Sequence, residues 1–291
     1  MQINAIHVVN NKTKCPIGGA GIVGQMLQNA TSHKINWINN DVTQIKKASI
    51  SVVYQLNKWP WLTIPRICHV ITEVIPESVF IYKDHDMLVT VAEHTWKMFR
   101  DFGYKTELIE NVARPSFSPG DKDVKLIRDV PILIYCGNFS SHKGTDKLIE
   151  AVKDLKCELW LIGKGNINKS KYRNVKFLGI KNENEIIKHL RSADIFVFPS
   201  ITEGMSLALL EAMAVGLPCI VTNIQANIDT CKDSAIYVDR DILSLRNGII
   251  KLIESKQLQK DLSGTALQIA STRKYEIWGE SFISIIENIL K

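Results

Sequence analysis

Two glutamates flanking a turn are the residues of this sequence whose type and spacing best fit a chemical role. Glu203 and Glu211 are eight residues apart in FVFPSITEGMSLALLEAMAVGLPCIVTN, and Gly204 and Ser206 lie between them at an expected strand-to-helix turn. Carboxylates accept hydrogen bonds from hydroxyl groups. If Ser206 is the N-cap, the free backbone N–H groups of 205–209 and the positive end of the helix dipole form a seat for a diphosphate.

The order of these groups along the chain points to a ligand. Glu203 precedes the helix start, and Glu211 lies roughly 7 Å further along the helix at about 1.5 Å per residue. A nucleotide sugar presents its sugar, diphosphate and ribose in the same order, with hydroxyl groups at both ends. Gly216 and Pro218 then end the helix, as a C-terminal glycine and a following proline do, so a helix is expected over 206–215.

Composition sets the frame for these residues. The 291 residues are 45% hydrophobic and form one large or two ordinary domains. The 36 Lys and Arg exceed the 30 Asp and Glu, giving a net charge of +6, which favours anionic ligands or membrane surfaces without requiring nucleic acid; a solvated basic surface explains it equally well. The six cysteines have no metal-type spacing and are expected to be reduced core thiols. With neither a leader pattern nor a long apolar run, the chain is expected to be cytoplasmic.

Short apolar runs alternate with helical segments along the whole chain, which predicts parallel α/β layers. In the first part, strands are expected at 2–9, 34–38, 49–56, 66–71 and 86–91, and helices from 21 and over 93–102. The proline- and charge-rich stretch 111–129 indicates a linker, with a boundary near 116–129.

A second doubly wound domain is expected after the linker. Its strands are expected at 131–137, 157–163, 174–179, 194–200, 218–223 and 235–239, with helices over 143–153, 183–191 and 206–215. The remainder is expected to be helical, closing with an amphipathic helix in 275–291. Its apolar face is expected to consist of Ile277, Phe282, Ile285, Ile286 and Leu290.

The second half resembles a known family, the retaining glycosyltransferases with two Rossmann-like domains, in particular glycosyltransferase family 4. The resemblance runs through PILIYCGNFSSHKGTDKLIEAV, LWLIGKGN, NVKFLGI and the stretch that holds both glutamates. It implies an α/β protein of the GT-B class, with two Rossmann-like doubly wound domains facing across a cleft and a shortened N-terminal domain. The expected limits are 1–117 for the acceptor-side domain, 118–275 for the nucleotide-sugar domain and 276–291 for a helix packing back on the first domain.

The resemblance also implies roles for individual residues. Glu203 would contact the donor sugar, Glu211 the ribose hydroxyls, and Lys143 would put a positive charge on the diphosphate, so that Glu203 and Lys143 are the expected catalytic residues. The implied donor-binding set is Gly18, Gly19, Asn138, Lys143, Ile180, Glu203, Gly204, Met205, Ser206, Leu207 and Glu211.

Two positions depart from the family pattern. Asn138 stands where relatives usually have an arginine, so charge on the leaving group would have to come from elsewhere, with Arg114 and His142 as candidates. Thr72 and Glu73 stand where relatives often have His-Asp. The acceptor-side candidates are therefore Thr72, Glu73 and Arg114.

The stretch GGAGIVG at 18–24 is open to two interpretations. Its GxGxxG spacing and Asp41 near the end of a second strand match a dinucleotide site in part, but NNKTKCPI separates the first strand from the glycines. The resemblance instead makes it a glycine-rich loop facing the donor phosphates, where Gly18 and Gly19 let backbone N–H groups approach closely. A tight turn for helix packing is the structural alternative.

The expected activity is transfer of a sugar from a UDP-, GDP- or ADP-sugar to a hydroxyl of a glycan, a lipid-linked or a small-molecule acceptor. Retention by front-face transfer is implied, with no cofactor, no metal ion and no nucleic acid. Peripheral association with the inner face of a membrane is a further expectation from NKWPWLTIPR and HTWKMFRDFGYK, although core packing of Trp96, Phe99 and Phe102 also explains the second segment. The alternative functions are a non-catalytic nucleotide-sugar binding protein and an NAD-dependent oxidoreductase.

Overall fold

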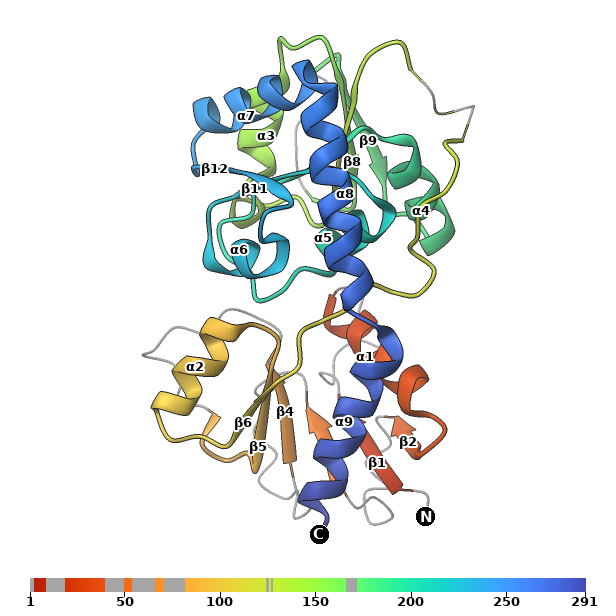
Figure 1. Cartoon of the computed structure of the whole chain (residues 1–291), viewed down its shortest axis with the longest axis vertical. Coiled ribbons are helices and arrows are strands. Elements are labelled where there is room, and N and C mark those ends of the chain that lie inside the picture. Colours follow the sequence, from red (N-terminus) through yellow and green to blue (C-terminus); the bar gives the residue numbers. More distant parts are fainter. Residues whose placement is uncertain are drawn as a thin grey trace. The chain divides into compact units, whose positions relative to one another are not determined.

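The computed structural model describes residues 3–8, 19–39, 50–53, 66–70, 82–123, 126, 128–165 and 172–291. The chain forms two compact units, each with its own six-stranded sheet (Figure 1). The first unit comprises Met1–Val112, Gly204–Ser206 and Arg273–Lys291, and the second comprises Ala113–Glu203 and Leu207–Thr272. Apart from Gly204–Ser206, the chain passes from the first unit to the second after 112 and returns after 272; the limits expected from the sequence are 117 and 275.

The first unit has strand order β2-β1-β3-β4-β5-β6, and every pair is parallel. This order is that of flavodoxin-like sheets, in which the order reverses between the first and third strands. Its elements are β1 (Ile3–Val8), α1 (Gly19–Thr31), β2 (Ile35–Asn39), β3 (Ile50–Val53), β4 (Arg66–Val70), β5 (Met87–Thr90), α2 (Glu93–Asp101), β6 (Thr106–Leu108) and α9 (Tyr275–Ile289). α9 comes from the end of the chain and packs against α1.

The second unit has strand order β12-β11-β10-β7-β8-β9, again parallel throughout. Counted from β7, this is the Rossmann order, whose switch point lies between β7 and β10. Its elements are β7 (Ile132–Cys136), a 3₁₀ turn (Ser141–Lys143), α3 (Thr145–Val152), β8 (Glu158–Ile162), β9 (Val175–Gly179), α4 (Glu183–Ser192), β10 (Ile195–Phe198), α5 (Leu207–Val215), β11 (Cys219–Thr222), α6 (Gln225–Cys231), β12 (Ala235–Val238), α7 (Ile242–Glu254) and α8 (Lys256–Thr272).

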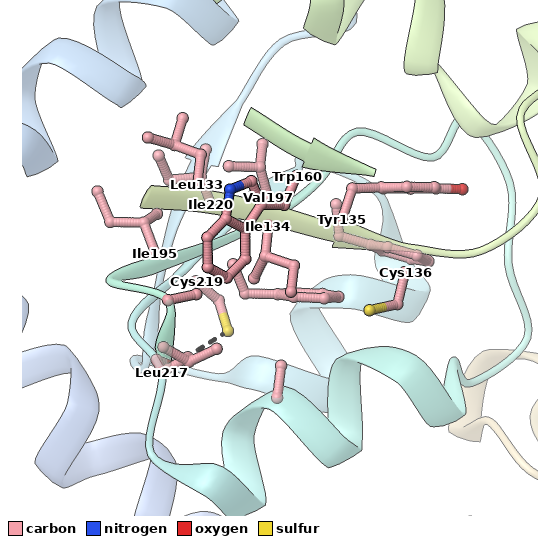
Figure 2. Packing of buried hydrophobic residues seen from close by; sticks show 14 of the residues in the cluster. Leu133, Ile134, Tyr135, Cys136, Trp160, Ile195, Val197, Leu217, Cys219 and Ile220 are labelled. Carbon is pink, nitrogen blue, oxygen red and sulfur yellow. Dashed lines mark hydrogen bonds between the residues drawn. The ribbon is translucent and has the colours of Figure 1, made fainter. Parts of the chain in front are cut away.

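Strands of a parallel sheet are covered on both faces, and the sequence of the second unit reflects this. All residues of β7, β10 and β11 are buried. Figure 2 shows side chains of these strands packed with Trp160 of β8 and with Leu217. Helix α3 packs against α7, and α5 packs against α8 and α4. A continuous core under the carboxyl ends of β7 and β10 therefore holds the loops that follow them.

The cysteines belong to this packing. All five described cysteines are free and buried. Burial raises the pKa of the Cys68 thiol to about 12 and that of Cys157 to about 11, so both stay neutral at physiological pH. The prediction of reduced core thiols is confirmed for these five; Cys15 lies outside the described residues.

Helix ends explain where the chain turns. At the start of α4, the Asn182 side chain accepts a hydrogen bond from Glu185 N, and the Glu185 carboxylate accepts one from Asn182 N, both at 3.0 Å. At the end of α5, Gly216 adopts a φ of 89° and Leu217 N donates to Ala212 O. This is a Schellman ending, and the predicted stop of the helix at Gly216 is confirmed.

The predicted α/β class with two Rossmann-like domains is confirmed, and the differences are local. α1 begins at Gly19, two residues before its expected start, and β6 and α6 were not expected because both are short. The expectation that Ile277 belongs to the apolar face of the last helix is wrong: its side chain is 61% exposed, whereas Phe282 and Ile286 are buried. In the described part of the chain, every helix is too short or too polar to span a bilayer.

Candidate functional site

The predicted site residues of the second unit gather at the carboxyl end of its sheet. β7 and β10 are neighbours, and the strand order reverses between them. Ligands of open α/β sheets bind outside the carboxyl ends of the strands at this switch point. Lys143 lies in the turn that follows β7, and Glu203 lies in the loop that follows β10.

Gly144 brings these two loops together. Its φ is +64°, and a Cβ at this position would lie 2.3 Å from the carbonyl oxygen of Pro199, so only glycine allows the turn to pack on the end of β10. Ile201 N then donates to His142 O at 2.8 Å. Gly144 also begins α3, which is why this helix starts at Thr145 and not at Lys143 as expected. The glycine of the KG pair therefore has a structural reason.

Lys143 and Glu203 form an ion pair between Nζ and Oε1. The Glu203 side chain is 12% exposed and that of Lys143 is 31% exposed, so the pair is partly shielded from water. Beneath it, the Tyr135 hydroxyl donates to Asn138 O at 2.8 Å, and burial together with the negative charge of Glu203 raises the pKa of Tyr135. The two predicted catalytic side chains thus lie in contact.

A buried polar network anchors the loop that bears Glu203. Thr222 Oγ1 donates to the carbonyl oxygen of Ser200, and Asn227 Nδ2 donates to Thr222 O at 2.9 Å. The Ser200 hydroxyl donates to Thr202 O at 3.1 Å. Each of these groups has its hydrogen-bond partner within the loop, in β11 or in α6, which makes the loop a rigid support.

Glu211 is the central residue of α5 and pairs with Arg114. Arg114 Nε donates to Glu211 Oε1, and Arg114 Nη1 donates to Glu183 Oε2, both at 2.6 Å. The Glu211 side chain is 6% exposed. Burial raises the pKa of this carboxyl above its ordinary value, the hydrogen bond and charge of Arg114 oppose the rise, and the charge of Glu183 adds to it.

α5 begins where the sequence led us to expect the N-terminus that would bind a diphosphate. α5 begins at Leu207, directly after Ser206. The segment Gly204–Ser206 belongs to the first unit. Within that unit, Asn111 Nδ2 donates to Met205 O at 3.1 Å. Binding of a diphosphate by these residues stays a prediction.

The other predicted residues fall into two groups. Ile180, directly after β9, is 59% exposed, and the Asn138 side chain is exposed after β7. Gly19 is the first residue of α1, which follows β1 at the switch point of the first sheet. The predicted residues that lie outside the described part of the chain are Gly18, Thr72, Glu73 and Asp41.

Sequence reasoning missed Glu183 and Tyr135. Glu183 lies 69 residues from its partner Arg114, and in KNENE it resembles an ordinary helix-start acid. Tyr135 lies within a continuous apolar run and is fully buried. One clue was available: the Asn182–Glu185 capping box fixes the start of α4 and thereby marks Glu183 as its first residue.

The two parallel sheets define a protein with two Rossmann-like domains, and its fold is that of the GT-B class. Solved structures similar to the chain include sucrose-phosphate synthase from Thermosynechococcus elongatus, with a TM-score of 0.82, 14% identity and 99% of both chains covered. They also include Anabaena HepE in complex with UDP and glucose, with a TM-score of 0.81, 13% identity, and 99% of this chain and 100% of that chain covered. The model of the family "Glycosyl transferases group 1" matches residues 120–268, and the chain belongs to this family.

Curated relatives of the chain are also named as glycosyltransferases, but they match a smaller share of it than the solved structures do. The chain is 36% identical over 109 residues to UDP-Gal:alpha-D-GlcNAc-diphosphoundecaprenol alpha-1,3-galactosyltransferase of Escherichia coli, covering 34% of this chain and 28% of that protein. The matches cover 28 to 51% of the first curated relatives, so the chain spans about half or less of their length.

Proposed function

We propose that the protein transfers a sugar from a nucleoside-diphosphate sugar to an acceptor hydroxyl. The observation that carries the proposal is the contact between Lys143 and Glu203 at the switch point of the second sheet, with Glu211 in the helix that follows. A cation for a diphosphate and carboxylates for sugar and ribose hydroxyls are the groups that such a donor requires. Membership of the family supports the same activity.

The proposed step proceeds with retention on one face of the sugar. The bond from the anomeric carbon to the diphosphate oxygen breaks, and the bond from the acceptor oxygen to that carbon forms on the same face. The acceptor proton passes to the departing phosphate oxygen. Lys143 and the N-terminal N–H groups of α5 stabilise the charge that develops on the diphosphate, so the step needs no metal ion, and Glu203 holds the sugar by its hydroxyls.

The names of similar proteins select the first substrates to test. HepE was solved with UDP and glucose, and the Escherichia coli relative is named for UDP-Gal and a diphosphoundecaprenol-linked acceptor. We therefore propose UDP as the first nucleotide and a lipid-linked glycan as an acceptor class. Peripheral binding at the inner face of a membrane would fit such an acceptor; Phe102 after α2 is 55% exposed, and Arg100 lies 4.5 Å from the ring centroid of Trp96.

Calorimetric titration with UDP, GDP, ADP and NAD tests the donor class. We expect one nucleoside diphosphate to bind the wild type and to bind Glu211→Ala about 10- to 100-fold more weakly, because hydrogen bonds from ribose hydroxyls to a carboxylate are lost. Arg191→Gln is the control, because it removes a hydrogen-bonded arginine that is not among the expected donor-binding residues; Arg191 Nε donates to Ser118 O at 3.0 Å. Binding of NAD alone, equal in Glu211→Ala, would overturn the proposal.

A non-catalytic binding protein is the second candidate, because Asn138 carries no charge where relatives usually have an arginine. Donor turnover separates the two candidates. Release of nucleoside diphosphate from a bound donor, stimulated by an acceptor and about 10²- to 10³-fold slower in Lys143→Met, is expected of the transferase. Tight donor binding without turnover against any acceptor of the three classes would favour the binding protein.

A further inference from the structure

Arg114 joins two acidic side chains that come from different helices of the second unit. Its guanidinium donates from Nε to Glu211 of α5 and from Nη1 to Glu183 of α4, both at 2.6 Å. The guanidinium carbon also lies 4.5 Å from the ring centroid of Phe117, and the Ser116 hydroxyl donates to the other oxygen of Glu183. The side chain of Arg114 is 14% exposed. A planar fork held on its face and at two donors has little freedom to turn toward another partner.

This fork compensates a buried charge. Three groups from different parts of the unit act on Glu211. They are the guanidinium of Arg114 in the linker, the carboxylate of Glu183 in α4 and the thiol of Cys136 in β7. Burial keeps the Cys136 thiol neutral by raising its pKa, so among the described residues the charged groups that act on Glu211 are one cation, Arg114, and one anion, Glu183. Without Arg114, the buried Glu211 would stand beside the negative charge of Glu183, and its proton affinity would rise. A protonated carboxyl accepts fewer hydrogen bonds than a carboxylate does.

The fork also connects two parts of the expected nucleoside site. Glu183 is the first residue of α4 and follows the segment Gly179–Asn182, which leaves β9 through a glycine with φ of 74°. Ile180 in this segment exposes 59% of its surface and offers an apolar face to a flat base. Arg114 therefore ties the carboxylate of α5 to the segment that carries Ile180.

We infer that Arg114 is a positioning residue of the donor site, which holds Glu211 as an ionised acceptor for the ribose hydroxyls and fixes it relative to the segment 179–183. The inference rests on the proposed function. It gives Arg114 a role beside the ribose, whereas the sequence led us to expect it either as a source of charge for the leaving group or on the acceptor side. Arg114 acts through Glu211 and does not touch the reacting atoms.

The test is the pH dependence of donor binding in Arg114→Gln. The probe is UDP-glucose, whose diphosphate is esterified at both ends and keeps its charge across the range; GDP- or ADP-glucose replaces it if the first titration selects another base. We expect affinity to fall about 10- to 100-fold near about pH 6 and to recover toward wild type near about pH 8.5, because Glu211 ionises again as the pH rises. Arg114→Lys, which keeps the charge and loses the fork, should lie between, and Glu183→Gln combined with Arg114→Gln should shift the recovery to lower pH.

The outcomes separate the inference from the proposed function. A loss in Arg114→Gln that is equal at all pH values would mean that Arg114 binds the donor directly, and would overturn the inference while the proposed function stands. Unchanged binding in both Arg114 variants would overturn it too. No binding of any nucleotide sugar by the wild type would overturn both. If Arg114→Gln does not fold, as judged by circular dichroism, Arg114→Lys against the control Arg191→Gln decides by the same pH comparison.

Discussion

Replacing Lys143 by methionine tests the pair at the centre of the proposed mechanism. Methionine keeps most of the length and volume of lysine and removes the charge. In the free protein the change leaves Glu203, whose side chain is 12% exposed, without its cation. In the donor complex it removes the positive charge that we expect on the departing diphosphate.

The two effects have different sizes. An unpaired carboxylate at this depth costs about 1 to 2 kcal/mol, discounted because Lys143 is partly exposed, and this lowers Tm by about 2 to 8 °C. Loss of a preorganised cation from the transition state costs about 3 to 4 kcal/mol, or about 10²- to 10³-fold in kcat. The activity effect is therefore the larger one.

Thermal unfolding and donor turnover are measured on Lys143→Met, on Lys143→Met combined with Glu203→Gln, and on Lys153→Met. Lys153 forms an exposed ion pair with Glu150 on the same helix segment and serves as the control. We expect the double variant to regain stability, since neither partner is then charged, and to stay inactive. If the double variant regained activity along with stability, the pair would be structural and the catalytic role of Lys143 would be refuted.

Further predictions concern the supports of the site and its surroundings. Gly144→Ala should lower Tm by more than Gly103→Ala, because both have positive φ but only the first meets a backbone carbonyl; equal losses in thermal scans would contradict this. Glu203→Gln should keep nucleotide binding within about threefold and lose about 10²-fold or more in turnover, since we propose that Glu203 holds the sugar and not the nucleotide; full turnover would remove Glu203 from the mechanism. Co-sedimentation with vesicles containing anionic lipid should fall in Phe102→Ser, and no binding by the wild type would remove the membrane proposal.

The parts of the fold set by local patterns could be predicted. Continuous apolar runs such as 132–136 indicated buried parallel strands, and Gly216 with Pro218 marked the end of α5. Local patterns failed where long-range packing decides. Ile277 has the spacing of a core residue, but it is exposed, whereas its neighbour Trp278 is buried and Gly279 of α9 lies close to Ala30 of α1.

For the site, residue types were easier to predict than partners. Glu203 and Glu211 were candidates because of their spacing around a strand-to-helix turn, and Lys143 was a candidate because GNFSSHKG resembles the donor-phosphate loop of the family. The Arg114 fork was not, because its partners lie 69 and 97 residues away and pair only when β9 and β10 have taken their places in the sheet. Ion pairs between residues so far apart in the sequence leave no periodic pattern from which they could be predicted.

The return of the chain to the first unit has a consequence for the order of folding during synthesis. α9 supplies Trp278, Phe282 and Ile286 to the core of that unit, and the Tyr275 hydroxyl donates to Met26 O at 2.7 Å. The ribosome must therefore complete the whole second unit before the first receives its last helix. Until then the face of α1 that α9 covers is exposed to water. We therefore expect chaperones to bind the first unit during synthesis.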